Sequence, residues 1–231
     1  MGYRYARQFT QHFLGKDNTE SIGDEPIDFA PGDIFFVLDL QPQVQVANRA
    51  FLQELRRYGV RVIFMVYDLL CVRMPQHFLS GAYDNMVAWL QVVAESDAAV
   101  CVSEATAMDL MRWTQENSVF RQRPFKIAWF HIGADIENSQ PTGGLPNDAN
   151  AILNLISSSP SFLMVSTIEP RKCHAQVIAA FEQLWQSSMQ VNLVILGKQG
   201  WMVEELVAKL RLHPELGKRL FWLEGISDEY L

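Results

Sequence analysis

The chain has 231 residues, of which 49% are hydrophobic and 19% are charged, and its formal net charge at pH 7 is -7. This length suits one large domain or two small ones with a buried core, which excludes a mainly disordered chain. The negative charge argues against the broad basic surface that nucleic acid requires, so we expect no nucleic-acid partner.

The cysteines and the chain start bear on the compartment. Cys71, Cys101 and Cys173 lie far apart and fit neither a disulfide framework nor a metal site. Separated thiols in odd number are typical of a reducing compartment, so we expect a cytoplasmic protein. The first residues lack the apolar core of a signal peptide, and no run approaches the roughly 20 apolar residues that cross a bilayer. We therefore expect no transmembrane segment.

Short apolar runs alternate with stretches of helical period along most of the chain. The runs lie at 33–39, 60–66, 98–102, 125–132, 162–165, 191–196 and 220–223. This alternation predicts strands joined by helices, which pair in parallel through right-handed crossovers, and apolar strands suit a sheet covered on both faces. Between the first two runs, the predicted inward stripe is Ala47, Ala50, Phe51, Leu55 and Tyr58. The predicted fold class is α/β, with two Rossmann-like units.

The alternation stops in the middle of the chain. Residues 133–146 are rich in Asn, Ser, Pro, Thr and Gly, a composition typical of linkers, and a short helical stripe precedes Pro160. We therefore predict a first unit at 1–132, a linker with a short helix at 133–160, and a second unit at 161–231.

The strongest local signal is the charged turn Thr167-Ile-Glu-Pro-Arg-Lys-Cys-His174, between a predicted strand and a predicted helix. Parallel sheets bind ligands beyond the carboxyl ends of their strands. Free backbone N–H groups at a helix start, with the guanidinium of Arg171 and the ammonium of Lys172, suit a phosphate or diphosphate. The alternative is an ordinary solvated turn in which Glu169 and Arg171 pair with each other.

Two further strand ends carry candidate groups. In Gly197-Lys-Gln-Gly-Trp201, glycines would let backbone approach a ligand and Lys198 would add charge, although the spacing is not that of a P-loop. The alternative is a flexible turn with Trp201 packed on the core. Asp68 follows the second predicted strand, where its carboxylate could accept a hydroxyl proton or only cap a turn.

The histidines give little support for other chemistry. His131 lies inside an apolar run and is expected to be a core histidine. His12, His77 and His213 show no partner spacing, so the sequence predicts neither a metal site nor a Ser-His-Asp triad.

Several of these segments resemble retaining glycosyltransferases of the GT-B fold, and more narrowly glycosyltransferase family 4, which includes many bacterial mannosyltransferases. The resemblance to the donor-binding half rests on Phe162-Leu-Met-Val-Ser-Thr-Ile-Glu-Pro-Arg-Lys172, Ala179-Ala-Phe181, Leu193-Val-Ile-Leu-Gly-Lys198 and Gly200-Trp201. The resemblance to the acceptor half and the interdomain loop rests on Val66-Tyr-Asp-Leu-Leu70, 97–103 and His131-Ile-Gly-Ala-Asp135.

The resemblance implies transfer of a sugar from a nucleotide diphosphate sugar to a glycan or lipid-linked acceptor in surface polysaccharide synthesis. It implies an acceptor-side first unit with Asp68 in a catalytic role and a donor-side second unit. The implied donor diphosphate site comprises Thr167, Glu169, Arg171, Lys172, Gly197 and Lys198. Arg171 and Lys172 would stabilise the charge that grows on the leaving diphosphate. No cofactor besides the donor substrate and no metal are implied.

The sequence departs from the family at several places. The family's Glu, seven residues, Glu motif would lie beyond Leu231, its first strand and glycine-rich loop are not seen, and Cys173 stands where Gly or Asn is usual. The resemblance therefore implies an incomplete GT-B chain, truncated at both ends, that alone lacks transfer activity. Uncovered sheet edges would promote association of copies, and the acceptor class leaves room for peripheral membrane contact.

Two other functions stay open. The first is a non-catalytic nucleotide-sugar or phosphate binder, either a remnant or a subunit that needs another polypeptide. The second is a flavodoxin-like regulatory domain in which Asp39 and Asp68 form a phosphoacceptor or magnesium pocket at neighbouring strand ends.

Overall fold

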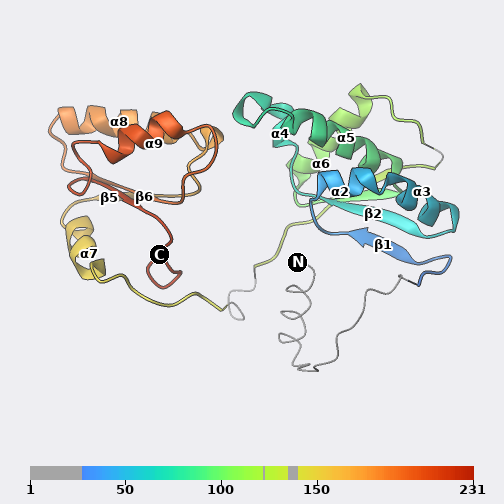
Figure 1. The fold of residues 1–231 in the computed structure, drawn as a ribbon, viewed down its shortest axis with the longest axis horizontal. Coiled ribbons are helices and arrows are strands. Elements are labelled where there is room, and N and C mark those ends of the chain that lie inside the picture. Colours follow the sequence, from blue (N-terminus) through green and yellow to red (C-terminus); the bar gives the residue numbers. More distant parts are fainter. Residues whose placement is uncertain (1–27, 122, 135–139) are drawn as a thin grey trace.

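The computed structural model describes residues 28–121, 123–134 and 140–231, and these form two parallel sheets (Figure 1). The first sheet has the order β1 (Ile34–Val37), β2 (Arg61–Val66), β3 (Ala98–Cys101) and β4 (Lys126–Trp129). The second has the order β5 (Ser161–Val165), β6 (Asn192–Leu196) and β7 (Leu220–Leu223). All seven predicted strands are confirmed, although β4 ends three residues earlier than its apolar run. Two separate sheets also argue against a single flavodoxin-like domain.

Helices connect successive strands, as the sequence predicts. In the first unit they are α2 (Pro42–Ala47), α3 (Arg49–Arg57), α4 (Leu70–Arg73), α5 (Ala82–Glu95) and α6 (Glu104–Glu116), with a 3-10 turn η1 (Pro75–His77). In the second they are α7 (Ala149–Ser157), α8 (His174–Gln186) and α9 (Glu204–Arg211), with a 3-10 turn η2 (Pro170–Lys172). The residues thus form the α/β architecture that the alternation predicts.

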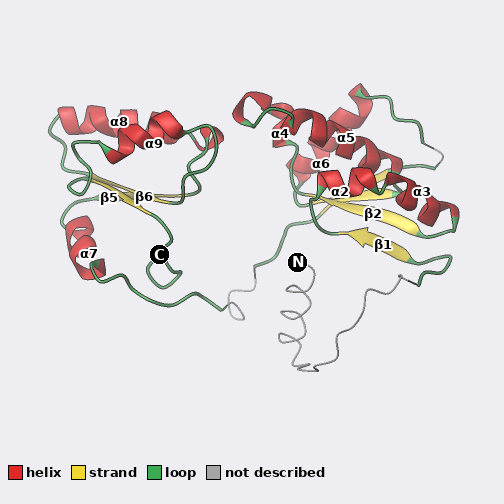
Figure 2. Ribbon diagram, in the orientation of Figure 1, coloured by secondary structure: helices red, strands yellow, loops and turns green. Residues whose placement is uncertain are grey.

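The helices of the first unit gather on one face of its sheet (Figure 2). Strands that follow one another in both sequence and position, with right-handed crossovers, place successive helices on the same face. Phe64, Val66 and Cys101 are buried beneath these helices, whereas Ile34 and Phe36 on the other face are 54% and 43% exposed. The expectation of a sheet covered on both faces is therefore wrong for the described residues of this unit.

The second sheet is covered on both faces. Helices α8 and α9 pack on the face that carries Leu193 and Ile195. Helix α7 packs on the opposite face, where its Ile152 and Ile156 contact the cluster of Val194, Leu196 and Phe221. These packed layers fix the carboxyl ends of β5 and β6, which carry the charged turn.

The first helical stretch differs from its predicted stripe. The helix breaks at Asn48 into α2 and α3, and a change of axis at such a break ends the regular spacing of the inward face. Leu52 and Leu55 are buried, whereas Phe51 and Tyr58 are 37% and 60% exposed. Of the predicted stripe, only Leu55 is buried.

Residues 142–144 of the predicted linker are bonded to the end of the second unit. The backbone N–H and the hydroxyl of Thr142 donate to Asp228 Oδ2 at 2.8 Å, and Gly144 N–H donates to Glu229 Oε2 at 2.6 Å. The hydrogen bonds from Thr142 lower the pKa of the Asp228 carboxyl. The exact unit boundaries stay a prediction. No helix in the described ranges has the length and apolarity needed to cross a membrane.

Candidate functional site

The loops that follow β5 and β6 are joined by backbone hydrogen bonds. Ser166 N–H donates to Leu196 O at 3.0 Å, Ile168 N–H donates to Lys198 O at 2.9 Å, and Gly200 N–H donates to Ile168 O at 3.0 Å. These bonds continue the pairing of the two strands beyond the sheet. They bring the charged turn and the second loop together at one sheet edge, as the sequence predicts.

Both glycines of the second loop are needed for this close approach. A Cβ atom on Gly197, whose φ is +156°, would lie 1.9 Å from Ser166 O. A Cβ atom on Gly200 would lie 2.7 Å from Ile168 O. Packing between the loops therefore explains both glycines without a ligand, and contact of Gly197 with a donor stays a prediction.

Arg171 and Glu169 lie next to each other at the sheet edge. Arg171 Nε lies 2.8 Å from Glu169 Oε2, but the two atoms are not aligned as a hydrogen bond. Glu169 is 6% exposed, so its carboxylate is a buried charge that needs a cation nearby. The ion pair named as the alternative for this turn is thus present. It fixes the Nε side of Arg171, and within the described residues no partner holds the two Nη groups.

Unpaired donors gather just after this ion pair. Lys172 forms no ion pair with any described residue, and no described carbonyl accepts from the backbone N–H groups of 174–176, the first turn of α8. The first N–H groups of any helix lack an internal partner and favour an anion. The turn thus supplies the free helix entrance and the two cationic side chains that the sequence predicts there.

The backbone at Cys173 adopts a conformation that Gly and Asn tolerate better than other residues. Its φ of +60° and ψ of +27° lie in the left-handed region, which costs an ordinary side chain roughly 1–2 kcal/mol. Its thiol is exposed, whereas Cys71 and Cys101 are buried. Burial raises the pKa of Cys101 to about 11 and, together with Asp68, raises the pKa of Cys71. The two buried thiols therefore pack as inert groups.

His174 is a feature of the turn that the sequence analysis missed. It is 1% exposed, its Nε2 lies 3.4 Å from Ser166 Oγ, and its Nδ1 has no partner in the described part of the chain. Burial lowers its pKa, with opposing contributions from Glu169, which raises it, and Lys172, which lowers it. A neutral imidazole therefore lies beneath the charged turn. The sequence offered one signal for the burial of His174, its position as the first residue of an amphipathic helix.

The remaining predicted site residues are solvent-exposed. Thr167, the first residue of the charged turn, and Lys198 in the second loop lie at the surface. Asp68 is exposed on the first unit, and its Oδ1 accepts from Leu70 N–H at 3.0 Å, which is the turn-capping contact named as its alternative. Among the described residues, no hydrogen bond or ion pair joins Asp68 to the loops after β5 and β6. His131 is exposed rather than in the core, because β4 ends at Trp129.

Trp201 joins the second loop to the first unit. Its indole Nε1–H donates to His77 O at 3.0 Å, and its ring lies 6.2 Å from that of Phe78, centroid to centroid. The alternative that placed Trp201 on its own core is therefore wrong, because the ring packs across to η1. A contact between distant parts of the chain leaves no local pattern in the sequence.

Comparison with known proteins defines the class first. No family model matches the chain. The crystal structure of an α,α-trehalose 6-phosphate synthase from Burkholderia multivorans superposes with a TM-score of 0.59, at 12% identity, over 88% of this chain and 49% of that one. Two parallel α/β units of this arrangement are those of the GT-B fold, and the chain covers part of it.

The sequence relatives are more specific. Over 233 aligned residues, 99% of the chain is 41% identical to a serotype-specific mannosyltransferase WbdA of Escherichia coli, and a second WbdA is 42% identical. The chain therefore has part of a GT-B fold and is related in sequence to the WbdA mannosyltransferases. It spans about 28% of the length of these curated relatives.

Proposed function

We propose that the chain forms part of a glycosyltransferase that transfers a sugar, with mannose as first candidate, from a nucleotide diphosphate sugar to a glycan or lipid-linked acceptor in surface polysaccharide synthesis. The observation that carries the proposal is the 41% identity to mannosyltransferases over nearly the whole chain. The location of the charged turn supports it, because such a turn at the carboxyl end of a parallel strand is where this architecture binds phosphates.

In this proposal the charged turn binds the donor diphosphate. The Nη groups of Arg171 and the ammonium of Lys172 donate to phosphate oxygens, together with the free N–H groups at the start of α8. As the glycosidic bond to the diphosphate breaks, negative charge accumulates on the leaving phosphate, and fixed cations stabilise it. Glu169 holds Arg171 in place before the donor arrives, so less side-chain entropy is lost on binding.

Asp68 is the acceptor-side group of the proposal. One of its carboxylate oxygens bonds Leu70 N–H, which orients the side chain at the strand end. The other oxygen is free, among the described residues, to accept a hydrogen bond from an acceptor hydroxyl. Transfer requires this group and the charged turn to face the same substrates. The contact of Trp201 with His77 links the two units that carry them.

The test is calorimetric titration of guanosine, uridine and adenosine diphosphates. Arg171→Ala is expected to weaken binding of the preferred diphosphate by about ten- to a hundredfold, because charge-assisted hydrogen bonds contribute roughly 1.5–3 kcal/mol each. Lys172→Ala is expected to weaken it less, since an ammonium makes no bidentate contact. Lys209→Ala, an exposed cation on α9, is the control and should leave binding unchanged. If Arg171→Ala binds the diphosphate as tightly as wild type does, the charged turn is not the diphosphate site.

The second candidate is a nucleotide-sugar binder without transfer activity. It is favoured by the absence, among the described residues, of any bond between Asp68 and the donor-side loops. Incubation with a radiolabelled donor and lipid-linked or glycan acceptors separates the two functions. Product formation supports the transferase, whereas diphosphate binding without product supports the binder. We place either function in the cytoplasm, because the exposed thiol of Cys173 suits a reducing compartment.

A further inference from the structure

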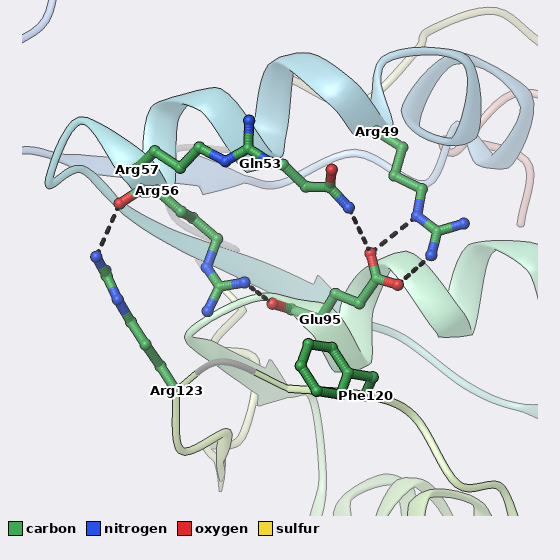
Figure 3. A pocket seen from close by; sticks show the side chains of 7 residues that line it. All are labelled: Arg49, Gln53, Arg56, Arg57, Glu95, Phe120 and Arg123. Carbon is green, nitrogen blue, oxygen red and sulfur yellow. Dashed lines mark hydrogen bonds and ion pairs between the residues drawn. The ribbon is translucent and has the colours of Figure 1, made fainter.

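A cavity of about 270 Å³ lies at the amino-terminal edge of the first sheet (Figure 3). Its lining includes four arginines from two segments: Arg49, Arg56 and Arg57 on α3, and Arg123 on the chain that leads into β4. The charged turn, in contrast, follows the carboxyl end of β5. The cavity therefore belongs to a different unit and to the opposite type of sheet edge.

Ionic contacts hold three of the arginines in place. Arg49 pairs with Glu95 through two nitrogens, and Arg56 pairs with Asp97 at 3.2 Å and also donates to Glu95 O. Arg123 forms a longer ion pair with Asp97 at 3.7 Å and donates to Arg56 O at 2.9 Å. Part of this network is structural, because basic groups at the ends of α3 and α5 satisfy terminal carbonyls and offset the helix dipoles.

The structural network does not use all of the positive charge. Four guanidinium groups face two carboxylates, and the oxygens of Glu95 are already taken by Arg49 and Gln53. Arg57 forms no ion pair or hydrogen bond with any described residue, and it also lines the cavity. The four arginines exceed the two carboxylates by two positive charges, although the net charge of the whole chain is -7. The cavity can therefore accept an anion without loss of its internal pairs.

An apolar ring lies beside this charge. Phe120 lines the cavity and is 82% exposed, so its ring is accessible to a ligand. Aromatic rings stack on planar or sugar rings, and guanidinium groups bind phosphate with two parallel hydrogen bonds. The volume is just below the roughly 300–1,000 Å³ of drug-sized ligand sites, so it fits a small phosphorylated compound rather than a polymer.

We propose that this arginine cavity is a second ligand site that binds a nucleoside phosphate, with the phosphates on Arg57 and the outer faces of Arg49 and Arg123 and the ring group on Phe120. The site is separate from the proposed donor site. Its occupancy therefore survives loss of the charged turn, and each proposal can fail without the other.

The experiment uses the chain that carries both Arg171→Ala and Lys172→Ala, so that the charged turn no longer binds phosphate. Pyrophosphate and guanosine diphosphate are titrated calorimetrically at constant ionic strength. Arg57→Ala in this background is expected to weaken both about tenfold, the effect of losing one charge-assisted contact. Phe120→Ala is expected to weaken guanosine diphosphate and leave pyrophosphate unchanged. Arg112→Ala, an exposed arginine on α6 outside the cavity, is the matched control.

Arg57 has no described partner, so Arg57→Ala should leave the thermal unfolding midpoint unchanged. A loss of binding can then be assigned to the missing contact with the ligand. Binding of both probes that Arg57→Ala weakens and Arg112→Ala does not would support the site. No binding in the background of Arg171→Ala and Lys172→Ala would overturn the proposal. Binding that is as tight with Arg57→Ala as without it would also overturn the proposal. An equal effect of Phe120→Ala on both probes would overturn the nucleoside assignment.

Discussion

The two strand ends that carry the predicted site differ in how firmly they are built. On the donor side, the loops after β5 and β6 are joined by backbone hydrogen bonds, and their glycines pack against carbonyl oxygens. On the acceptor side, Asp68 is exposed and has one backbone bond, to Leu70. The proposed donor side is thus preorganised within its own unit, whereas Asp68 on the proposed acceptor side is held by one described hydrogen bond.

The largest expected effect comes from breaking the donor-side loop packing. Gly197→Ala places a Cβ 1.9 Å from Ser166 O, so we expect it to lower the free energy of unfolding of the second unit by about 3 kcal/mol or more. Gly217→Ala is the matched control, since its φ is also positive but no atom lies within 4 Å of its Cβ, and it should cost about 1–2 kcal/mol. Urea unfolding checks both, and equal losses would contradict the packing account.

Acidification should also weaken the donor side. Because burial lowers the pKa of His174 below its ordinary 6.5, the unfolded chain binds a proton that the folded chain does not. Unfolding free energy therefore falls as pH drops below about 6.5, with a slope of up to about 1.4 kcal/mol per pH unit until the folded-state pKa is passed. Urea unfolding of His174→Gln between pH 7 and 5 should show a flatter dependence. A dependence in His174→Gln as steep as in wild type would contradict this account.

The link between the two regions depends on the Trp201 indole. Trp201→Phe keeps a ring beside Phe78 but loses the hydrogen bond to His77 O, which contributes about 1 kcal/mol. We expect faster limited proteolysis within 133–146, and a greater increase with Trp201→Ala. Trp222→Phe, which loses a bond within the second unit, is the comparison. Unchanged cleavage in both Trp201 variants would show that this contact does not hold the units together.

The smallest expected effect is a gain in unfolding free energy when Cys173 is replaced by glycine. Cys173→Gly removes the left-handed strain, and after the entropy cost of glycine in the unfolded chain we expect a gain of about 0.5–1 kcal/mol in unfolding free energy. Cys173→Ala keeps the strained conformation and should bring no gain. Thermal unfolding midpoints of the two variants test this. A gain from alanine equal to that from glycine would mean that the backbone is not strained.

Much of this molecule follows from local pattern. Apolar runs predict every strand, and strand ends predict where the charged turn and Asp68 lie. Contacts between segments distant in the chain could not be predicted, because they leave no periodicity. The packing of Gly197 on Ser166, the bond from Trp201 to His77, and the one-sided cover of the first sheet are of this kind. The helix break at Asn48 could not be predicted, because residues 43–58 contain neither glycine nor proline to mark it.

The central claim is that the charged turn binds the diphosphate of a donor, and the sharpest test measures the diphosphate contribution alone. For wild type, the nucleoside diphosphate that binds best is compared calorimetrically with the same nucleoside without phosphates. We predict that the diphosphate binds at least about tenfold more tightly, and that most of this ratio is lost when Arg171→Ala and Lys172→Ala are combined. A ratio that persists in the double variant, in protein whose circular dichroism spectrum shows it folded, would contradict the account.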